Sequence, residues 1–332
     1  MKHGAGIYKV AKRLKCTPEE ILDFSSNINS YTKQTQTQLT TEELVRYGDT
    51  TYSTLKQTIA KTYQLKKTHI ALYNGATSAI FALINSLKNK RAYLYVPLYG
   101  EYEKALKLAQ KKIIKIDRAK ELYAKPKKNS LILFVNPSTP DGTYYNLSKL
   151  FQLWKKQNCT IVVDESFLEF ESLPSLRHEL QNYDKLYIIQ SFTKFYACGG
   201  VRVGAIFSQK NNIQKLHQPL WHLSSYDVKF LLERLKDTTF KKAAKKAHRK
   251  NKKELLKLLK NSSHFTKVMP SDANFILTQT KDGTKLTDAL LKKKILVRRC
   301  GSFDTLTDDW LRFGVKNKKM HKKLKDALHH IP

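Results

Sequence analysis

Residues 160–194 read TIVVDESFLEFESLPSLRHELQNYDKLYIIQSFTK, and this stretch carries the pattern from which the fold is predicted. It holds two short apolar runs, Thr160–Val163 and Leu186–Gln190, which are rich in the β-branched and aromatic residues that favour strands. Polar residues follow each run, with Asp164 directly after the first and the sequence SFTK, ending in Lys194, after the second. The stretch therefore predicts two buried strands that each end in a functional side chain.

The pattern of residues 160–194 extends in both directions as strands alternating with helices. Further strands are expected at Ala92–Val96, Ile113–Ile116, Leu131–Val135 and Val203–Phe207, and helices at Thr54–Tyr63, Thr77–Leu87, Gly100–Gln110 and Leu147–Gln157. Such alternation is typical of an α/β fold with a mostly parallel sheet and helices on both faces.

After about residue 210 the alternation of strands and helices gives way to long basic helices, which predicts a second domain. Long basic helices are expected at Ile213–Leu235 and Phe240–Leu259, followed by short strands at Asn274–Leu277, Ile295–Arg298 and Leu311–Val315. We therefore expect an N-terminal segment (1–40) that packs with the small domain, a large domain (41–210) and a small C-terminal α+β domain (211–332). Residues 30–41 are rich in Thr and Gln, without periodicity, and are interpreted as a linker.

Functional side chains follow several of the predicted strands of the large domain. Asn136 follows Leu131–Val135, and Arg202 lies in a Gly-rich turn before Val203–Phe207. In open α/β sheets, ligands bind beyond the carboxyl ends of the strands. We therefore expect Asn136, Asp164, Lys194 and Arg202 to converge on one edge of the sheet.

The chain is strongly basic, with 61 Lys and Arg residues against 28 Asp and Glu residues and a formal charge of +33. Such a charge favours association with polyanions, so nucleic acid must be considered as a partner. However, the lysines are spread along the whole chain, and no helix-turn-helix, zinc-finger or RNA-binding signature accompanies them. Composition thus favours a general lysine bias over a dedicated nucleic-acid surface.

Other compositional features favour a cytoplasmic protein without a metal site. No apolar run approaches the roughly 18 to 20 residues of a membrane helix, and the first residues lack the layout of a secretory signal. Four cysteines (Cys16, Cys159, Cys198 and Cys300) lie far apart without a CxxC pair. This spacing argues against a zinc site or a disulfide framework.

Taken together, Asn136, Asp164, the SFTK run that ends in Lys194 and the turn that holds Arg202 resemble the fold-type I enzymes that depend on pyridoxal 5′-phosphate (PLP), the aminotransferase class I and II group. The resemblance covers nearly the whole chain and implies that fold, a large PLP-binding domain and a smaller α+β domain. It implies that Lys194 is the catalytic lysine that forms a Schiff base with the cofactor, and that Asp164 pairs with the pyridinium nitrogen. Asn136 matches the asparagine that bonds the ring O3′.

The same resemblance assigns the rest of the cofactor site. Tyr99 matches the aromatic residue that stacks on the ring, and Tyr47 matches a tyrosine that reaches the cofactor phosphate of a partner subunit, which implies a homodimer. The cofactor phosphate is expected to be held by Gly75, Ala76, Thr77, Ser191, Thr193 and Arg202.

Two branches of this group fit the sequence best: threonine-phosphate decarboxylase of cobamide biosynthesis, a lyase, and histidinol-phosphate aminotransferase. The N-terminus favours the decarboxylase, because His3–Ile7 (HGAGI) and Asp23–Asn29 (DFSSNIN) resemble motifs of that branch. Phe167 stands where many aminotransferases have a tyrosine, and Arg299 occupies a position that is commonly Asp. The sequence does not separate threonine phosphate from serine phosphate as the substrate.

The resemblance also indicates which residues bind a small phosphorylated amino acid. Arg312 matches the arginine that grips the substrate carboxylate, Arg298 and His3 are candidates for the substrate phosphate, and Asn29 is a further substrate-binding candidate. Amino transfer on a phosphorylated substrate stays open as an alternative. A polyanion-binding protein that has lost the chemistry of the fold is the third hypothesis, against which the intact Asn136, Asp164, Lys194 and Arg202 count.

Overall fold

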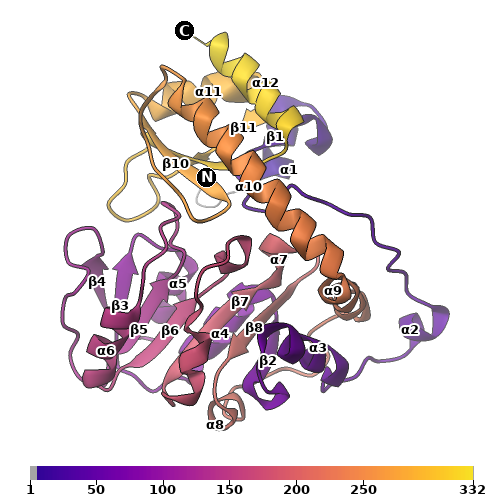
Figure 1. The fold of residues 1–332 in the computed structure, drawn as a ribbon, viewed down its shortest axis with the longest axis vertical. Coiled ribbons are helices and arrows are strands. Elements are labelled where there is room, and N and C mark those ends of the chain that lie inside the picture. The colour runs from indigo at the N-terminus through magenta and orange to yellow at the C-terminus, as the bar shows by residue number, and fades with distance from the viewer. Residues whose placement is uncertain (1–5, 332) are drawn as a thin grey trace.

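The computed structural model describes residues 6–331, which form two layered domains joined by one long helix (Figure 1). A seven-stranded sheet forms the centre of the large domain, in the order β2-β8-β7-β6-β5-β3-β4. Its strands are β2 (Ile70–Asn74), β3 (Arg91–Val96), β4 (Lys112–Asp117), β5 (Leu131–Val135), β6 (Thr160–Asp164), β7 (Leu186–Ser191) and β8 (Val203–Phe207). The run β7-β6-β5-β3-β4 is parallel, and β8 is antiparallel to both of its neighbours. The predicted mostly parallel α/β sheet is thus confirmed.

Helices cover both faces of this sheet because its strands are apolar on both faces. Alternate residues of β5 enter two separate cores: Ile132 and Phe134 face one, and Leu131 and Leu133 face the other. The first core packs against α3 and α6, and the second against α4 and α5. The helices of this region are α2 (Thr41–Val45), α3 (Ser53–Tyr63), α4 (Gly75–Ser86), α5 (Glu101–Leu108), α6 (Ser148–Lys156), α7 (Phe192–Phe195), α8 (Lys210–Ile213) and α9 (Ser225–Lys236).

The small domain packs four antiparallel strands against three helices and the N-terminal segment. Its larger sheet has the order β12-β13-β10-β9, and a two-stranded sheet joins β1 to β11 in parallel. The strands are β1 (Leu22–Asp23), β9 (Phe265–Val268), β10 (Phe275–Thr280), β11 (Ile295–Leu296), β12 (Arg298–Arg299) and β13 (Trp310–Gly314), and the helices are α1 (Ile7–Leu14), α10 (Thr238–Lys260), α11 (Gly283–Lys292) and α12 (Lys318–His329). Residues 31–40 form neither helix nor strand.

One expectation about residues 211–332 differs from the structure. The single helix expected at Ile213–Leu235 is wrong, because α8 ends at Ile213 and α9 begins at Ser225, with the helix-breaking Pro219 between them. The expected domain boundary at residue 210 stays a prediction. Phe240 of α10 belongs to the core of the large domain, whereas Leu255 of the same helix belongs to the core of the small domain. The two hydrophobic cores therefore meet within α10.

A buried histidine links α12 to the strand end of the small domain. The His321 side chain is 4 % exposed, and its Nε2 accepts a hydrogen bond from the backbone N–H of Lys316. Burial lowers the pKa of His321 from 6.5 to about 4, although Glu254 lies 3.8 Å from its Nδ1. The neutral imidazole is therefore the form that the fold requires.

We predict that His321 makes the protein sensitive to acid between pH 6.5 and about 4. Its folded pKa is lowered, so the unfolded chain takes up the proton first, and stability falls as the pH falls through this window. The free energy of unfolding of the wild type should therefore drop relative to His321→Gln by up to about 3 kcal/mol. Urea denaturation at a series of pH values measures this difference. The exposed His217→Gln is the matched control, and parallel curves for wild type and His321→Gln would contradict the prediction.

Candidate active site

A cavity of about 600 Å³ lies where the carboxyl ends of β5, β6 and β7 meet the small domain and the N-terminal segment. Most of the predicted site residues line it, namely Ala76, Thr77, Tyr99, Asp164, Ser191, Thr193, Lys194, Arg202, Arg298 and Arg312. They come from strand ends and loops more than 200 residues apart in the sequence. The tertiary structure therefore brings the cofactor and substrate candidates of the sequence into one cavity.

Asp164 ends β6 and is held by two donors on different elements. Its Oδ2 accepts a hydrogen bond of 2.8 Å from the hydroxyl of Tyr102, and its Oδ1 accepts one of 2.9 Å from the backbone N–H of Ser166. Tyr102 is 1 % exposed, and its burial, together with the neighbouring carboxylate, raises the pKa of its hydroxyl well above the usual value. Tyr102 is thus a permanent donor that fixes the orientation of Asp164.

Lys194 belongs to the short helix α7, directly after β7. Its Nζ lies 3.4 Å from both Ser191 Oγ and Thr193 Oγ1. Burial lowers the pKa of the Lys194 ammonium, Asp164 raises it, and Arg202 and Arg312 lower it further. A lowered pKa increases the fraction of neutral amine, which is the nucleophilic form that attacks a carbonyl.

One end of the cavity has the features of an anion site. Ala76 and Thr77 lie in the first turn of α4, where free backbone N–H groups favour a phosphate. The guanidinium of Arg202 lies over Gly75, so close that a Cβ on Gly75 would fall 2.5 Å from its Nη2. Gly75 also has a φ of +78°, which glycine adopts without strain. These two constraints explain why this loop requires glycine.

The small-domain end of the cavity holds a second cationic group. Arg312 on β13 is buried, and its Nη1 donates to Thr139 Oγ1 at 2.9 Å. With its amide oxygen turned toward the guanidinium, Asn27 accepts from Nη1 and Nη2 at 3.2 and 3.1 Å. Among residues 6–331, Arg312 pairs with no acidic side chain, and its Nε has no partner. Burial lowers its pKa to about 10, so the group stays charged at neutral pH and lacks a counter-ion.

Arg298 lies beside Arg312 on the neighbouring strand β12, and its Nη2 donates to Ser302 Oγ at 2.7 Å. Both guanidinium groups lie near the ring of Phe303, at 5.6 Å for Arg298 and 6.0 Å for Arg312. Arginine is suited to planar recognition of carboxylate and phosphate. This end of the cavity can therefore bind one or two anionic groups.

The segment Asp23–Asn29 forms a wall of the cavity between Lys194 and Arg312. Its turn is closed by Asp23 Oδ1, which accepts from the backbone N–H and the hydroxyl of Ser25. The buried Lys316 donates from its Nζ to the carbonyl of Ser26 at 2.9 Å, and burial lowers the pKa of Lys316 to about 8. Ser25, Ser26, Asn27 and Ile28 line the cavity.

Some predicted site residues make other contacts. The amide of Asn136 exchanges two hydrogen bonds with the backbone of Tyr145, at 3.0 and 2.8 Å. Asn29 donates from Nδ2 to the carbonyl of Phe195 and anchors the N-terminal segment. Neither side chain is among those that line the cavity in the described part of the chain. Their expected roles stay predictions.

Two further positions, Tyr47 and Arg299, lie outside the cavity. Tyr47 is 83 % exposed and packs on Trp221, with 4.6 Å between the ring centroids. Arg299 donates to Thr284 Oγ1 at 3.1 Å and belongs to another surface, so its charge does not line the substrate end. His3 lies outside the described residues. Within residues 6–331 no three His, Cys, Asp or Glu side chains are grouped as metal ligands, and no helix is both long and apolar enough to cross a membrane.

Sequence reasoning missed Tyr102, Asn27 and Thr139. Tyr102 had a usable signal, since it stands three residues after Tyr99 and lies in the first turn of α5 (Glu101–Leu108). Asn27 lies within the DFSSNIN run that the sequence analysis quotes. Its contact with Arg312 and that of Thr139 had no local signal, because Arg312 lies far away in the sequence.

The sequence profile of aminotransferase class I and II matches residues 19–331. The chain belongs to the aminotransferase class I and II family. It is 29% identical to the adenosylcobalamin biosynthesis bifunctional protein CobDQ of Leptospira interrogans, over 99% of this chain and 41% of that longer protein. It is 24% identical to the threonine-phosphate decarboxylase of Salmonella typhimurium, over 99% and 96% of the two chains. The crystal structure of histidinol-phosphate aminotransferase from Clostridium acetobutylicum is 28% identical, with a TM-score of 0.81 over 93% of this chain and 98% of that one.

Members of this family use PLP, and the cavity of this family member fits the cofactor. It has a buried carboxylate, Asp164, a lysine with a lowered pKa, Lys194, and a glycine-dependent anion cradle under Arg202. The ring nitrogen, the aldehyde and the phosphate of PLP each have a chemical counterpart in this set. Tyr99, whose hydroxyl lies 3.4 Å from Thr77 Oγ1, contributes an aromatic ring to the lining of the cavity.

We predict that Tyr102→Phe weakens PLP binding about 10- to 100-fold, because a hydrogen bond to a charged group contributes about 1.5–3 kcal/mol. The variant keeps the buried ring but removes the donor to Asp164. Titration of the protein with PLP, followed by absorbance, measures the dissociation constant.

Tyr73→Phe is the control for this prediction. Tyr73 is also buried, and its hydroxyl donates to the carbonyl of His217, away from the cavity. Equal PLP affinity of Tyr102→Phe and Tyr73→Phe would mean that Tyr102 does not act through Asp164.

Proposed function

We propose that this protein decarboxylates L-threonine O-3-phosphate, with serine phosphate as a possible smaller substrate, and releases an amino-alcohol phosphate for cobamide biosynthesis. Two kinds of observation support this activity. The curated relatives include a threonine-phosphate decarboxylase and a bifunctional protein of adenosylcobalamin biosynthesis. The cavity also has cationic groups from both domains, Arg202 from the large one and Arg298 and Arg312 from the small one.

The position of the segment Asp23–Asn29 is the observation that carries the proposal. Its sequence resembles the decarboxylase branch, but such a run could simply form a strand and a turn. Here only Leu22–Asp23 form a strand, and the residues after them line the cavity. Asn27 contacts the guanidinium of Arg312, and the backbone N–H of Asn29 donates to the carbonyl of Lys194. The part of the sequence that favours decarboxylation thus borders the substrate end of the cavity.

The two arginines of the small domain suit a substrate with two anionic groups. Arg312 lacks an acidic partner within the described residues, which suits a carboxylate. Arg298 lies beside it and suits the phosphate. Threonine phosphate carries both groups on one small molecule, so each of the two arginines would contact one of them.

Different residues of the chain would have different roles in the reaction. When bound, PLP supplies an electron sink for the electron pair that the broken Cα–carboxylate bond leaves on Cα. Asp164, oriented by Tyr102, would hold a proton on the ring nitrogen, and Arg312 would orient the carboxylate. Lys194 would then deliver a proton to Cα as CO2 leaves.

Amino transfer to or from a phosphorylated substrate such as histidinol phosphate is the second candidate. The overall similarity to the Clostridium acetobutylicum aminotransferase structure favours it. Phe167 counts against it, because this cavity-lining ring packs on Phe275 at 5.0 Å between centroids and has no hydroxyl to offer a cofactor.

We predict that the protein loaded with PLP releases CO2 from threonine phosphate without any keto acid, while the yellow cofactor returns unchanged. Lys194→Ala should lower the rate at least about 100-fold, since the variant lacks the residue that holds the cofactor and moves the proton. Enzyme-coupled CO2 detection and absorbance spectra measure the two effects.

The opposite result also has a clear meaning. Absence of CO2, together with conversion of the cofactor to its pyridoxamine form by histidinol phosphate, would assign the protein to the aminotransferases. A near-normal rate for Lys194→Ala would refute the role of this lysine.

We also propose that the active protein is a homodimer in which Tyr47 reaches the partner's site. An exposed apolar patch supports this assembly, formed by Leu44, Val45, Tyr47, Leu220, Trp221 and Tyr226. Trp221 donates from Nε1 to the carbonyl of Gly48, which fixes it under the Tyr47 ring. Contiguous exposed apolar side chains of this kind mark interaction sites.

For this patch we predict that the 38.4 kDa chain sediments at twice its mass, and that Tyr47→Ser/Trp221→Ser shifts it to the monomer. The reason is that rings of this kind contribute most of the binding energy of an interface. Analytical ultracentrifugation measures the mass. Tyr123→Ser removes another exposed ring, 57 % exposed, and should leave the dimer intact. A monomeric wild type would refute the proposal.

A further inference from the structure

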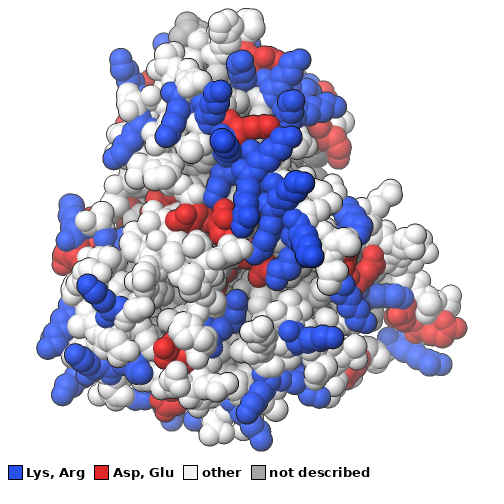
Figure 2. All heavy atoms as spheres, viewed as in Figure 1, with Lys and Arg blue, Asp and Glu red and all other residues white. Residues whose placement is uncertain are grey.

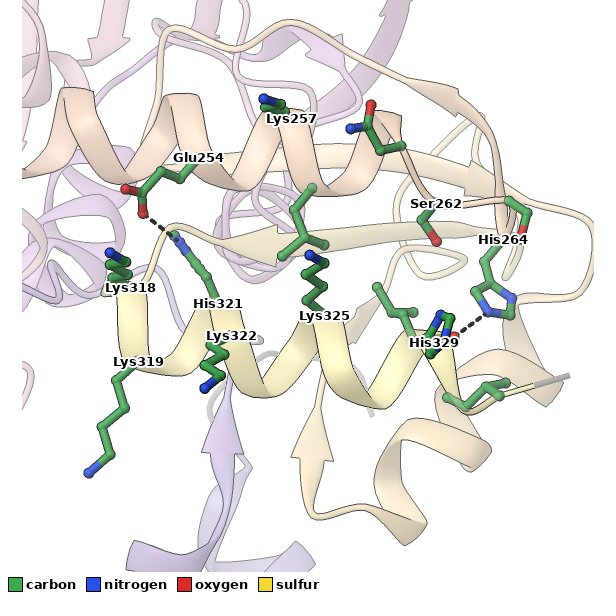
Figure 3. A pocket seen from close by; sticks show the side chains of 15 residues that line it. Glu254, Lys257, Ser262, His264, Lys318, Lys319, His321, Lys322, Lys325 and His329 are labelled. Atoms are coloured by element: carbon green, nitrogen blue, oxygen red, sulfur yellow. Dashed lines mark hydrogen bonds and ion pairs between the residues drawn. The ribbon is translucent and has the colours of Figure 1, made fainter.

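A second hollow lies between α10 and α12, on the surface of the small domain. Figure 3 shows the two helices side by side with a groove between them, and its volume is about 800 Å³. The carboxylate of Glu254 lies 3.8 Å from Nδ1 of the neutral His321 at one place, and His264 Nε2 lies 2.9 Å from the carbonyl of Leu328 at another. It shares no lining residue with the active-site cavity. The proposed catalysis therefore leaves this groove unused.

The lining of the groove combines an apolar floor with a cationic rim. Leu258, Leu328 and Ile331 supply apolar surface. The rim carries five lysines, Lys257, Lys318, Lys319, Lys322 and Lys325. All five are exposed, and none pairs with an acidic side chain in the part of the chain that the structure describes. Glu254 is the single acidic residue of the lining.

The rim continues a larger basic surface. Figure 2 shows Lys and Arg side chains gathered in a band along α10 and onto the small domain, with few acidic residues between them. With a formal charge of +33, the whole chain attracts acidic partners and repels basic ones. Charge complementarity thus selects an anionic occupant for the groove.

The apolar floor limits which kinds of anionic molecule fit the groove. Single-stranded nucleic acid binds by stacking on aromatic rings, and no Phe, Tyr or Trp lines the groove. A planar membrane meets protruding surfaces, whereas this floor is recessed between two helices. A second copy of the chain would bring its own excess of lysines. Its helix α2 has two acidic residues in the first turn and exposes Leu44 and Val45, but it has only five residues and is too short to fill the groove.

We propose that the groove between α10 and α12 binds an acidic amphipathic α-helix of another protein. Its apolar stripe, spaced i, i+3, i+4 and i+7, would cover Leu258, Leu328 and Ile331, and its Asp and Glu residues would pair with the lysines on both rims. The twelve residues of α12 extend about 18 Å, which matches a helix of about three turns. This surface is independent of the proposed catalytic activity.

The probe for this proposal is a fluorescein-labelled peptide of about 12 residues, with leucines at the helical spacing above and Glu on both flanks. Fluorescence anisotropy with the full-length protein should show binding at least about 10-fold tighter than for a peptide of the same composition with the leucines scrambled. Lys322→Glu/Lys325→Glu should weaken binding at least about 10-fold, and Leu258→Ala about 5-fold.

Lys125→Glu/Lys128→Glu is the matched control. It makes the same change in net charge on exposed lysines of the large domain, and binding should stay within about 2-fold of the wild type. Thermal denaturation and PLP titration establish that every variant is folded and loaded.

Several outcomes would overturn the proposal. Equal affinity of the scrambled peptide, or equal weakening by the control pair, would mean that only bulk charge is sensed. Tighter binding of a DNA duplex or of phosphatidylglycerol vesicles than of the peptide, with the same loss in Lys322→Glu/Lys325→Glu, would assign the groove to nucleic acid or to membranes instead.

Discussion

A buried negative charge at the end of the central strand β6 is the constraint on which the active site depends. A carboxylate taken out of water must be paired or hydrogen-bonded, or the fold loses several kcal/mol. Asp164 meets this requirement through Tyr102 on α5 and the backbone of Ser166, with the amine of Lys194 near enough to feel its charge. The carboxylate therefore ties together a helix on one face of the sheet, its own strand and the neighbouring β7–α7 turn.

Both domains contribute residues to the lining of the cavity. The residues that suit the cofactor, such as Asp164 and Lys194, belong to the large domain, whereas Arg298 and Arg312 belong to the small one. Helix α10 contributes to both cores, and the segment Asp23–Asn29 crosses from β1 to the carbonyl of Lys194. A shift of one domain against the other would thus change the substrate end more than the cofactor end.

Arginine and lysine serve different purposes in this chain. Only eleven of its 61 basic residues are arginine, yet three of those eleven, Arg202, Arg298 and Arg312, line one cavity. The planar guanidinium binds carboxylate and phosphate with two parallel hydrogen bonds, which an ammonium group cannot do. The lysines instead cover the outside, where their long stems shield apolar surface and their charges stay in water. The groove between α10 and α12 is the place where this lysine surface surrounds a recessed apolar floor.

The α/β class and the convergence of Asn136, Asp164, Lys194 and Arg202 could be predicted from local sequence, because strand periodicity and the residues after each strand end are local properties, whereas their roles toward the cofactor came from the resemblance to the family. Asp164 and Lys194 could be named in advance for this reason, since the carboxyl ends of parallel strands meet at one edge. The break between α8 and α9 also had a local signal, Pro219, but the prediction of a single helix at Ile213–Leu235 did not take it into account. The tertiary structure alone decided the rest. Tyr102 on Asp164, Asn27 on Arg312, the side chain of Asn136 turned to Tyr145 and the two cores meeting inside α10 all depend on contacts between distant segments, which no local pattern encodes.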